Sequence, residues 1–181
     1  IYTRKNKMLY KKIGTLPQDI LDEFKEEILE RKDPSKGYQW IEFDNYLNGK
    51  FYEIWENEKL DVRQWEDKWI QKAFYSPPQE GWKVHKDGIN CKTALNIAIQ
   101  CNDTDWVRWY DEDYINTQAN VISAKAQGIG NSRNIDIENY EELEYVKQII
   151  PKEGDVYLVN TDVFHSFKCG GPKDRIIVQT K

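Results

Sequence analysis

The chain has 181 residues and carries 26 lysines and arginines against 31 aspartates and glutamates, which gives a net charge of −5. This length suits one domain with its own core, and the acidic balance argues against a surface that binds nucleic-acid phosphates. No apolar run approaches the roughly 18 residues of a membrane span, and no charged-then-apolar leader indicates a signal peptide. The three cysteines lack CxxC spacing, which favours free thiols in the cytoplasm.

The first part of the chain predicts helices. From Pro17 to Lys32 apolar residues recur at spacings of three and four, with Thr15 placed as the cap. A second apolar stripe predicts a helix from Val62 to about Phe74, ended by the Ser76-Pro77-Pro78 stretch. Residues 1–81 are therefore expected to be a mainly helical flank of a single domain that spans residues 1–181.

After Gly81 the pattern changes to short alternating runs rich in β-branched and aromatic residues, separated by turn signals. The expected strands are Trp82–Lys86, Lys92–Gln100, Trp106–Asp111, Tyr145–Ile150, Asp155–Asn160, Phe164–Cys169 and Arg175–Thr180. Such strands without crossover helices favour an antiparallel sandwich or barrel over residues 82–181. The polar stretch from Ile115 to Asn139 has no clear period and predicts a lid, a binding loop or a mobile segment.

One constellation of side chains indicates chemistry. His85 and Asp87 stand two residues apart at the tip of a predicted strand, so their side chains point to the same face. The only other histidine, His165, opens a later predicted strand, and Arg175 follows ten residues after it. Two histidines and one carboxylate are the donor set of non-haem Fe(II) oxygenases. An arginine nearby suits a dicarboxylic acid, because its planar group binds a carboxylate by two hydrogen bonds.

Two segments of the sequence carry a family resemblance. The stretches VHKDGINCKTALNIAIQCNDTDWVRWYDE and EGDVYLVNTDVFHSFKCGGPKDRIIVQT resemble the Fe(II)/2-oxoglutarate-dependent dioxygenases. Within them the sequence is closest to the aspartyl/asparaginyl hydroxylase-like branch and its small phage and bacterial relatives. The similarity covers about Trp82 to Thr180. It implies a mainly β fold with flanking helices, a double-stranded β-helix of the jelly-roll, cupin-like type.

The resemblance also implies roles for individual residues. His85, Asp87 and His165 would be the catalytic iron ligands, and Arg175 would bind the distal carboxylate of 2-oxoglutarate. Asn96 lies where relatives place a polar side chain near this cosubstrate. The implied enzyme uses Fe(II), 2-oxoglutarate and O2 to hydroxylate a protein side chain, a peptide or an amino acid, with release of succinate and CO2. A phage-encoded chain would act in the host cytoplasm.

Other interpretations of these residues stay open. His85 and Asp87 are also compatible with a polar turn, His165 with a core histidine, and Arg175 with a surface ion pair to Asp174. At the level of function, the alternatives are a cupin-like metal enzyme that uses no keto acid and a non-catalytic jelly-roll binding module. Nucleic-acid demethylation is disfavoured by the acidity of the chain. The sequence specifies no oligomeric state.

Overall fold

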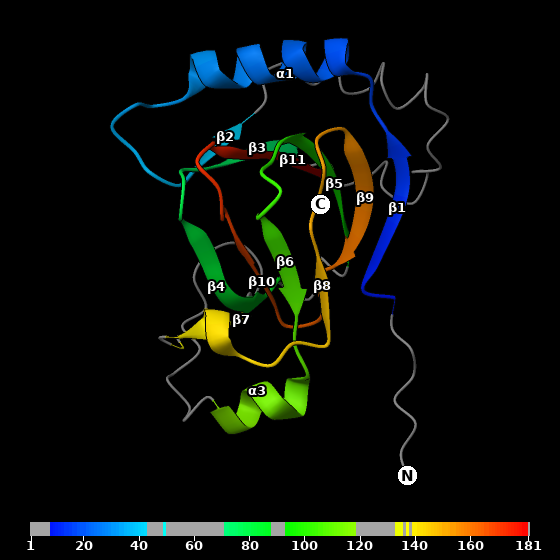
Figure 1. The fold of residues 1–181 in the computed structure, drawn as a ribbon, viewed down its shortest axis with the longest axis vertical. Helices are drawn as coiled ribbons and strands as arrows, with labels where there is room; N and C mark the ends of the chain where they lie inside the picture. Colours follow the sequence, from blue (N-terminus) through cyan, green and yellow to red (C-terminus); the bar gives the residue numbers. More distant parts are fainter. Residues whose placement is uncertain are drawn as a thin grey trace.

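The protein consists of two antiparallel sheets that pack face to face (Figure 1). The structure, a computed structural model, describes residues 8–42, 49, 71–87, 93–118, 133–135, 137 and 139–180. The larger sheet has the strand order β1 (Tyr10–Thr15), β9 (Asp155–Asn160), β5 (Thr93–Gln100), β11 (Arg175–Thr180), β3 (Gln71–Ser76) and β2 (Gln39–Glu42). The smaller sheet has the order β7 (Arg133–Asn134), β4 (Gly81–Lys86), β10 (His165–Lys168), β6 (Trp106–Trp109) and β8 (Lys147–Ile149). This mainly β jelly roll is the fold that the sequence predicts.

The strands predicted after Gly81 are all present among the described residues. β9 and β11 have the predicted bounds, β4 begins one residue earlier than predicted, and the other four lie inside their predicted ranges. β5 and β9 are buried almost throughout, whereas β8 has no buried residue, so burial does not alternate in every strand. Short runs rich in β-branched and aromatic residues between turn signals were enough to predict them.

The first predicted helix is confirmed, but its cap is not. α1 spans Gln18–Arg31 and lies across the outer face of the larger sheet (Figure 1). Thr15 is the last residue of β1 rather than a cap, and Pro17 takes the capping position without a side-chain hydrogen bond. Gln18 instead donates through Nε2 to Asp22 Oδ1 at 2.9 Å, one helical turn away.

The second predicted helix is wrong where the structure describes it. Residues 62–70 lie outside the described residues, whereas Gln71–Ser76 form β3 between β2 and β11. Pairing on both sides gives this segment more backbone hydrogen bonds across the sheet than an isolated helix end would offer. Ser76 therefore ends a strand, and the turn that follows is closed by a 3.2 Å bond from Glu80 N to Pro77 O. Among the described residues up to 81, α1 is a helix, and β1, β2 and β3 are strands of the larger sheet. Residues 43–48 and 50–70 lie outside the described part, so the mainly helical flank expected over residues 1–81 stays a prediction.

Three buried clusters hold these layers together. The first joins α1 to the outer face of the larger sheet, with Leu21, Phe24 and Ile28 as its helical members. A second fills the space between the two sheets and includes Trp109 and Tyr157. The third lies on the outer face of the smaller sheet. Burial of apolar area in these clusters is the main stabilising contribution to the fold.

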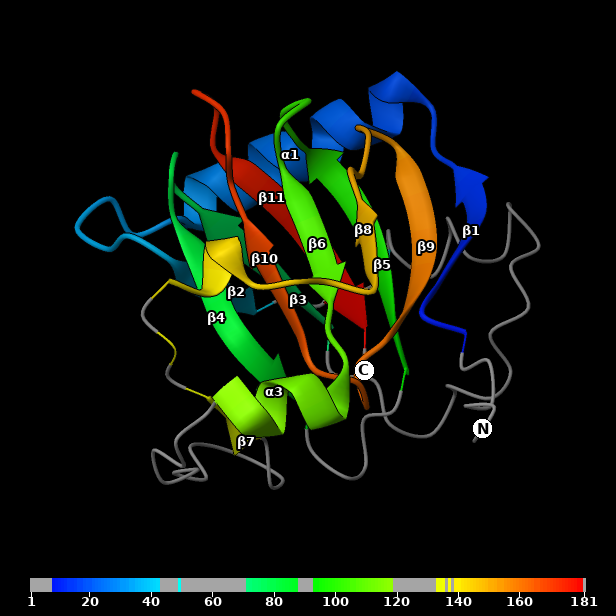
Figure 2. The same cartoon turned by 60° about the horizontal axis from the view of Figure 1, so that its bottom comes forward.

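A short helix occupies the start of the stretch from Ile115 to Asn139, which the sequence left without a period. α3 spans Glu112–Gln118 at one end of the barrel (Figure 2), and Tyr114 N donates to Asp111 Oδ1 at 3.0 Å, as in a helix cap. Residues 119–132 lie outside the described part, and the 3-10 turn η2 (Tyr140–Glu142) follows β7. Among the helices described, none has the length and apolar character needed to cross a bilayer.

Candidate functional site

The two histidines of the chain lie side by side on neighbouring strands. β4 and β10 pair antiparallel with His85 directly opposite His165, and the two ring centroids are 4.2 Å apart. Directly opposite residues on an antiparallel pair point to the same face, here the interior between the sheets. His165 is 9% exposed, and its other strand neighbour is the buried Trp109. The pairing brings together two residues that are 80 positions apart in the chain.

Asp87 completes the cluster just after β4 ends. Its backbone N–H donates to Thr161 O at 3.0 Å, which fixes the chain where it leaves the strand. Its Oδ1 atom lies 3.8 Å from His85 Nε2. The possible ligand atoms of His85, Asp87 and His165 all lie within 4.8 Å of one another, and the three side chains are largely shielded from solvent. The arrangement is suited to a single divalent metal ion bound by two nitrogens and one oxygen.

Backbone carbonyls orient both imidazoles. His85 Nδ1 lies 2.8 Å from Lys83 O, and His165 Nδ1 lies 2.9 Å from Val163 O. A carbonyl oxygen only accepts hydrogen bonds, so each Nδ1 carries the proton and each Nε2 keeps the lone pair that binds a metal. Such outer partners fix the ring orientation of metal-binding histidines. In both cases the acceptor is the carbonyl two residues earlier, a feature that the sequence does not reveal.

Arg175 is buried in the interior rather than paired at the surface. It begins β11, is 3% exposed, and its guanidinium lies over the ring of Phe167 at 4.4 Å. The alternative of a surface ion pair with Asp174 is therefore wrong. Its Nε atom has no hydrogen-bond partner among the described residues. A buried cationic donor without an acceptor is costly, which indicates that a further group belongs beside it.

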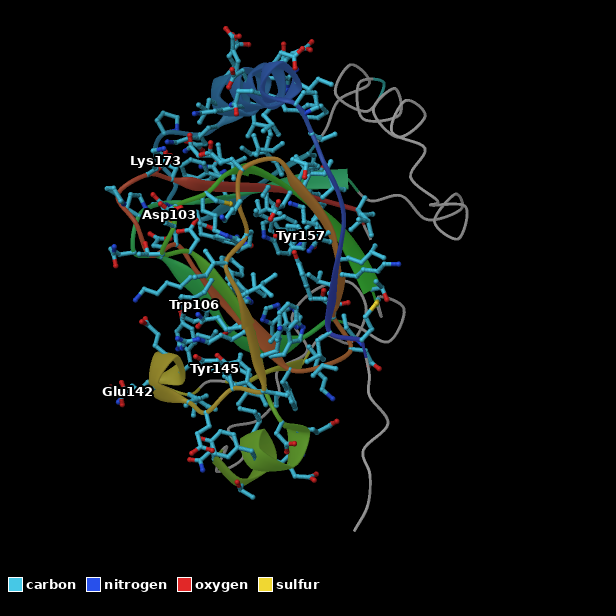
Figure 3. The ribbon with its side chains drawn as sticks, turned by 45° about the vertical axis from the view of Figure 1, so that its right-hand side comes forward. Asp103, Trp106, Glu142, Tyr145, Tyr157 and Lys173 are labelled. Atoms are coloured by element: carbon cyan, nitrogen blue, oxygen red, sulfur yellow. The ribbon has the colours of Figure 1, made fainter. Side chains whose placement is uncertain are left out.

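Two hydroxyls share this condition with Arg175. Within the described part of the chain, neither Ser76 Oγ nor the Tyr157 hydroxyl has a hydrogen-bond partner, and both are buried. Ser76 is directly opposite Arg175 on β3, and Tyr157 lies between the two sheets (Figure 3). Burial raises the pKa of Tyr157 above its ordinary value, whereas Arg175 acts in the opposite direction. The Asn96 side chain, directly opposite on β5, also lowers this pKa, but its contact with the hydroxyl falls outside hydrogen-bond geometry. The hydroxyl is consequently a neutral donor beside a cation.

Asn96 is on the inner face of the larger sheet, as the resemblance implies for a residue near the cosubstrate. It is buried on β5, directly opposite Tyr157 on β9 and Gln179 on β11. Gln179 Nε2 donates to Asn96 Oδ1 at 2.9 Å. The amide is thus already engaged with a neighbouring strand, and a contact between Asn96 and a bound molecule stays a prediction.

Several interior residues were not singled out from the sequence. Ser76 gives no signal, because its neighbours predicted the end of a helix. Tyr157 could have been placed facing the interior, since it alternates with Val159 on a strand that was predicted correctly. Tyr157 lies within the second segment that carries the family resemblance, whereas Ser76 lies outside both segments.

Comparison with known proteins identifies the fold. HygX from Streptomyces hygroscopicus, crystallised with nickel and 2-oxoglutarate, matches with a TM-score of 0.61 and 10% identity over 94% of this chain and 81% of that chain. A prolyl-4-hydroxylase from Pseudomonas putida matches with a TM-score of 0.55 and 11% identity over 94% and 90% of the two chains. The viral collagen prolyl hydroxylase of Paramecium Bursaria Chlorella virus-1 gives 0.50 and 13% over 99% and 95%.

These structural matches confirm the expected fold: the chain has the jelly roll of the Fe(II)/2-oxoglutarate oxygenases. No protein-family model matches the sequence, and no curated protein matches it. Two of the three structures are prolyl hydroxylases, so the aspartyl/asparaginyl hydroxylase-like branch stays a prediction.

Proposed function

We propose that this chain is an Fe(II)- and 2-oxoglutarate-dependent oxygenase that hydroxylates a protein side chain, a peptide or an amino acid. The observation that carries the proposal is the convergence of His85, Asp87 and His165 inside the barrel, with their ligand atoms within 4.8 Å of one another. Three protein ligands of this kind leave positions on a six-coordinate metal for a cosubstrate and oxygen.

The residues present fit Fe(II). Both imidazoles hold their protons on Nδ1 through backbone carbonyls, and Asp87 supplies the anionic oxygen that the metal's charge requires. When bound, the iron and its keto acid would supply the oxidising chemistry that no protein side chain can provide. The chain's own contribution is to fix the direction from which each ligand approaches.

The residues present also fit a dicarboxylic keto acid. Arg175 Nε, Ser76 Oγ and the Tyr157 hydroxyl are buried donors whose partners are lacking among the described residues. A carboxylate accepts several hydrogen bonds at once and neutralises the guanidinium. The resemblance leaves open which hydroxyl assists Arg175, since Ile177 stands where some family members have serine. We assign that role to Ser76 and Tyr157.

The walls between these two ends of the site are apolar. Phe167 lies two residues after His165 on β10, and the Arg175 guanidinium packs over its ring. Val107 lies opposite Phe167 on β6. Side chains of this kind exclude water, which strengthens each electrostatic contact in the interior. They would hold the cosubstrate extended between the metal ligands and Arg175.

The substrate class comes from the resemblance and from the structural neighbours. Two of the neighbours are prolyl hydroxylases, and HygX has also been crystallised with hygromycin B. A side chain of a protein or peptide, or a free amino acid, is therefore the substrate that we propose. A metal enzyme without a keto acid would not explain why the buried Arg175 Nε has no acceptor among the described residues.

Anaerobic titration tests this proposal. Adding 2-oxoglutarate to the Fe(II)-loaded protein should produce a weak visible charge-transfer band. His165→Ala should lose the metal, because it removes one of three ligands. Arg175→Ala should keep the metal but bind 2-oxoglutarate roughly 100-fold more weakly, as expected for about 3 kcal/mol of charge-assisted hydrogen bonding. Lys173→Ala is the matched control, because this exposed cation lies only two residues from Arg175.

Two outcomes would contradict the assignment. If the wild-type protein binds Fe(II) but shows no band with 2-oxoglutarate, a metal enzyme without a keto acid becomes the better explanation. If Arg175→Ala and His165→Ala lose metal and keto acid to the same extent, the separate roles given to the two residues are wrong. Oxygen consumption coupled to succinate release then measures the reaction itself.

A further inference from the structure

Tyr38 fills the gap between the two sheets on the side of β2 and β4. Its ring centroid lies 5.0 Å from that of Trp82 and 6.0 Å from that of Phe167, both on the smaller sheet. On the larger sheet it faces Phe74 at 6.4 Å. Contacts of this kind with both layers place the half-buried Tyr38 ring at the edge between the two sheets. The residue precedes β2, so in the sequence it is far from the two segments that carry the family resemblance.

The same ring contacts connect Tyr38 to both ends of the candidate site. Trp82 lies edge-on to His85 with their ring centroids 6.4 Å apart. Phe167 carries the guanidinium of Arg175 on its ring. Tyr38 contacts both of these aromatic residues, so a single aromatic side chain separates its ring from His85 on one side and from Arg175 on the other.

The hydroxyl of Tyr38 is oriented by a neighbour. Trp40 Nε1 donates to the Tyr38 oxygen at 2.9 Å, which uses one acceptor position and leaves the O–H hydrogen for another partner. Burial raises the pKa of Tyr38, the Trp40 bond and Arg175 lower it, and Asp87 raises it further. Both a cationic and an anionic residue of the site therefore act on this one hydroxyl, which stays protonated and able to donate.

The backbone holds Tyr38 in register with the site. Its N–H donates to Glu80 Oε2 at 3.2 Å, and Glu80 belongs to the turn that joins β3 to β4. The preceding Gly37 packs so closely that an added Cβ would lie 2.9 Å from Glu80 Oε1. Tyr38 is thus tied to the connection between the strands that carry Ser76 and His85.

We propose that Tyr38 is a further cosubstrate-binding residue, whose hydroxyl donates a hydrogen bond to the dicarboxylate held between Arg175 and the metal ligands. The inference rests on the proposed function and adds a contact from outside the segments that resemble the oxygenase family. It also gives Trp40 a role: by donating to the Tyr38 oxygen, Trp40 directs the O–H hydrogen towards the interior.

Calorimetry on the full chain loaded with Mn(II) tests this contact without turnover. Tyr38→Phe removes only the hydroxyl, so 2-oxoglutarate should bind roughly tenfold more weakly, as expected for one hydrogen bond to a charged group. The Mn(II) affinity and the melting temperature should stay at the wild-type values. Trp40→Phe should weaken 2-oxoglutarate by a smaller factor, because the hydroxyl remains but loses its orienting donor. Tyr145→Phe, at an exposed tyrosine, should change neither affinity.

The outcomes separate this inference from the proposed function. If the wild-type protein binds 2-oxoglutarate and Arg175→Ala weakens it, but Tyr38→Phe binds it as tightly as the wild type, the hydroxyl contact is refuted and the proposed function stands. If Tyr38→Phe loses Mn(II) and 2-oxoglutarate together, the residue has a structural role only. If the wild-type protein binds Mn(II) but no 2-oxoglutarate, both the inference and the proposed function fail.

Discussion

Buried donors without acceptors distinguish the interior of this barrel from an ordinary core. Native proteins pair most buried polar atoms, because each unpaired one costs about 1–3 kcal/mol. Arg175 Nε, Ser76 Oγ and the Tyr157 hydroxyl nevertheless lack partners among the described residues. Ser76 lies directly opposite Arg175, and the arginine acts on the pKa of Tyr157. A shared anionic ligand would satisfy all three donors at once.

Tyr157→Phe tests this explanation for a single atom. Removing a buried hydroxyl that has no partner should leave the free energy of unfolding of the free protein unchanged or raise it by up to about 1 kcal/mol. The same change should weaken 2-oxoglutarate binding to the Mn(II)-loaded protein about tenfold. Urea unfolding and calorimetry measure the two effects.

Tyr110→Phe is the matched control for that experiment. Tyr110 is equally buried, but its hydroxyl lies 2.6 Å from Ser166 Oγ and belongs to the cluster on the outer face of the smaller sheet. The substitution should cost about 1 kcal/mol of stability and leave 2-oxoglutarate binding unchanged. Equal losses of stability in the two variants would show that Tyr157 has a partner of its own in the folded chain.

The residues predicted from the sequence differ from the missed ones in how locally they are specified. His85 and Asp87 share a face because they stand two apart on a strand, which depends only on local geometry. The prediction that His165 lies next to them depended on the family resemblance, because the alternation of polar and apolar residues does not specify which strands are neighbours in a sheet. Ser76 and Tyr38 reach the interior only through pairing of β3 with β11 and packing against Trp82, and no local pattern specifies either contact.

At the scale of elements, two errors have identifiable physical causes. Burial alternates over only four residues of β3, Lys72 to Tyr75, and such a short run is compatible with a helix as well as with a strand. The strand that pairs with its far side, β11, lies about 100 residues away in the sequence. α3, in contrast, had a local signal: Asp111 in the capping position, followed by Glu112 and Asp113 in the first turn. Asp111 had been interpreted as the end of a strand, which concealed that cap.

The buried carboxylate of Asp105 joins two loops at one end of the barrel by hydrogen bonds. Asp105 accepts hydrogen bonds from Asn102 N and Nδ2, each at 3.0 Å, and from Gly170 N at 2.9 Å. Asn102 Nδ2 in turn lies 2.8 Å from Lys173 O, and Figure 3 shows Asp103 and Lys173 at this same end. The segment after β5 is thereby joined to the segment between β10 and β11.

Asp105→Ala should therefore destabilise the fold strongly. It would leave the N–H groups of Asn102 and Gly170 without acceptors, at a cost of about 3 kcal/mol for hydrogen bonds to a charged group. Asp103→Ala, at an exposed neighbour two residues earlier, should change the free energy of unfolding by less than about 0.5 kcal/mol. Chemical denaturation of both variants measures the difference, and similar values for the two would contradict the bridging role.

For the whole molecule, the division of the site between the two sheets is the important feature. The proposed metal ligands come from β4, the residue after it and β10 in the smaller sheet, whereas Arg175, Ser76 and Tyr157 come from β11, β3 and β9 in the larger sheet. Figure 2 shows these strands in two layers. The jelly roll brings them together because β10 and β11 are consecutive in the chain but lie in opposite layers. A metal ion alone would contact one layer, whereas a keto acid bound to it would connect both.

Thermal unfolding should distinguish binding to one layer from binding to both, because the melting temperature should rise once with the metal and again with the keto acid. Mn(II) should raise the melting temperature, and 2-oxoglutarate at about 100 times its Kd should add roughly 2.7 kcal/mol, or about 5–10 °C for a chain of this size. Arg175→Ala should keep the Mn(II) step and lose most of the second, because the larger sheet no longer holds the distal carboxylate. His165→Ala should lose both steps, and Lys173→Ala should keep both. A full second step in Arg175→Ala would mean that the keto acid is held by the smaller sheet alone, contrary to the bridge between layers.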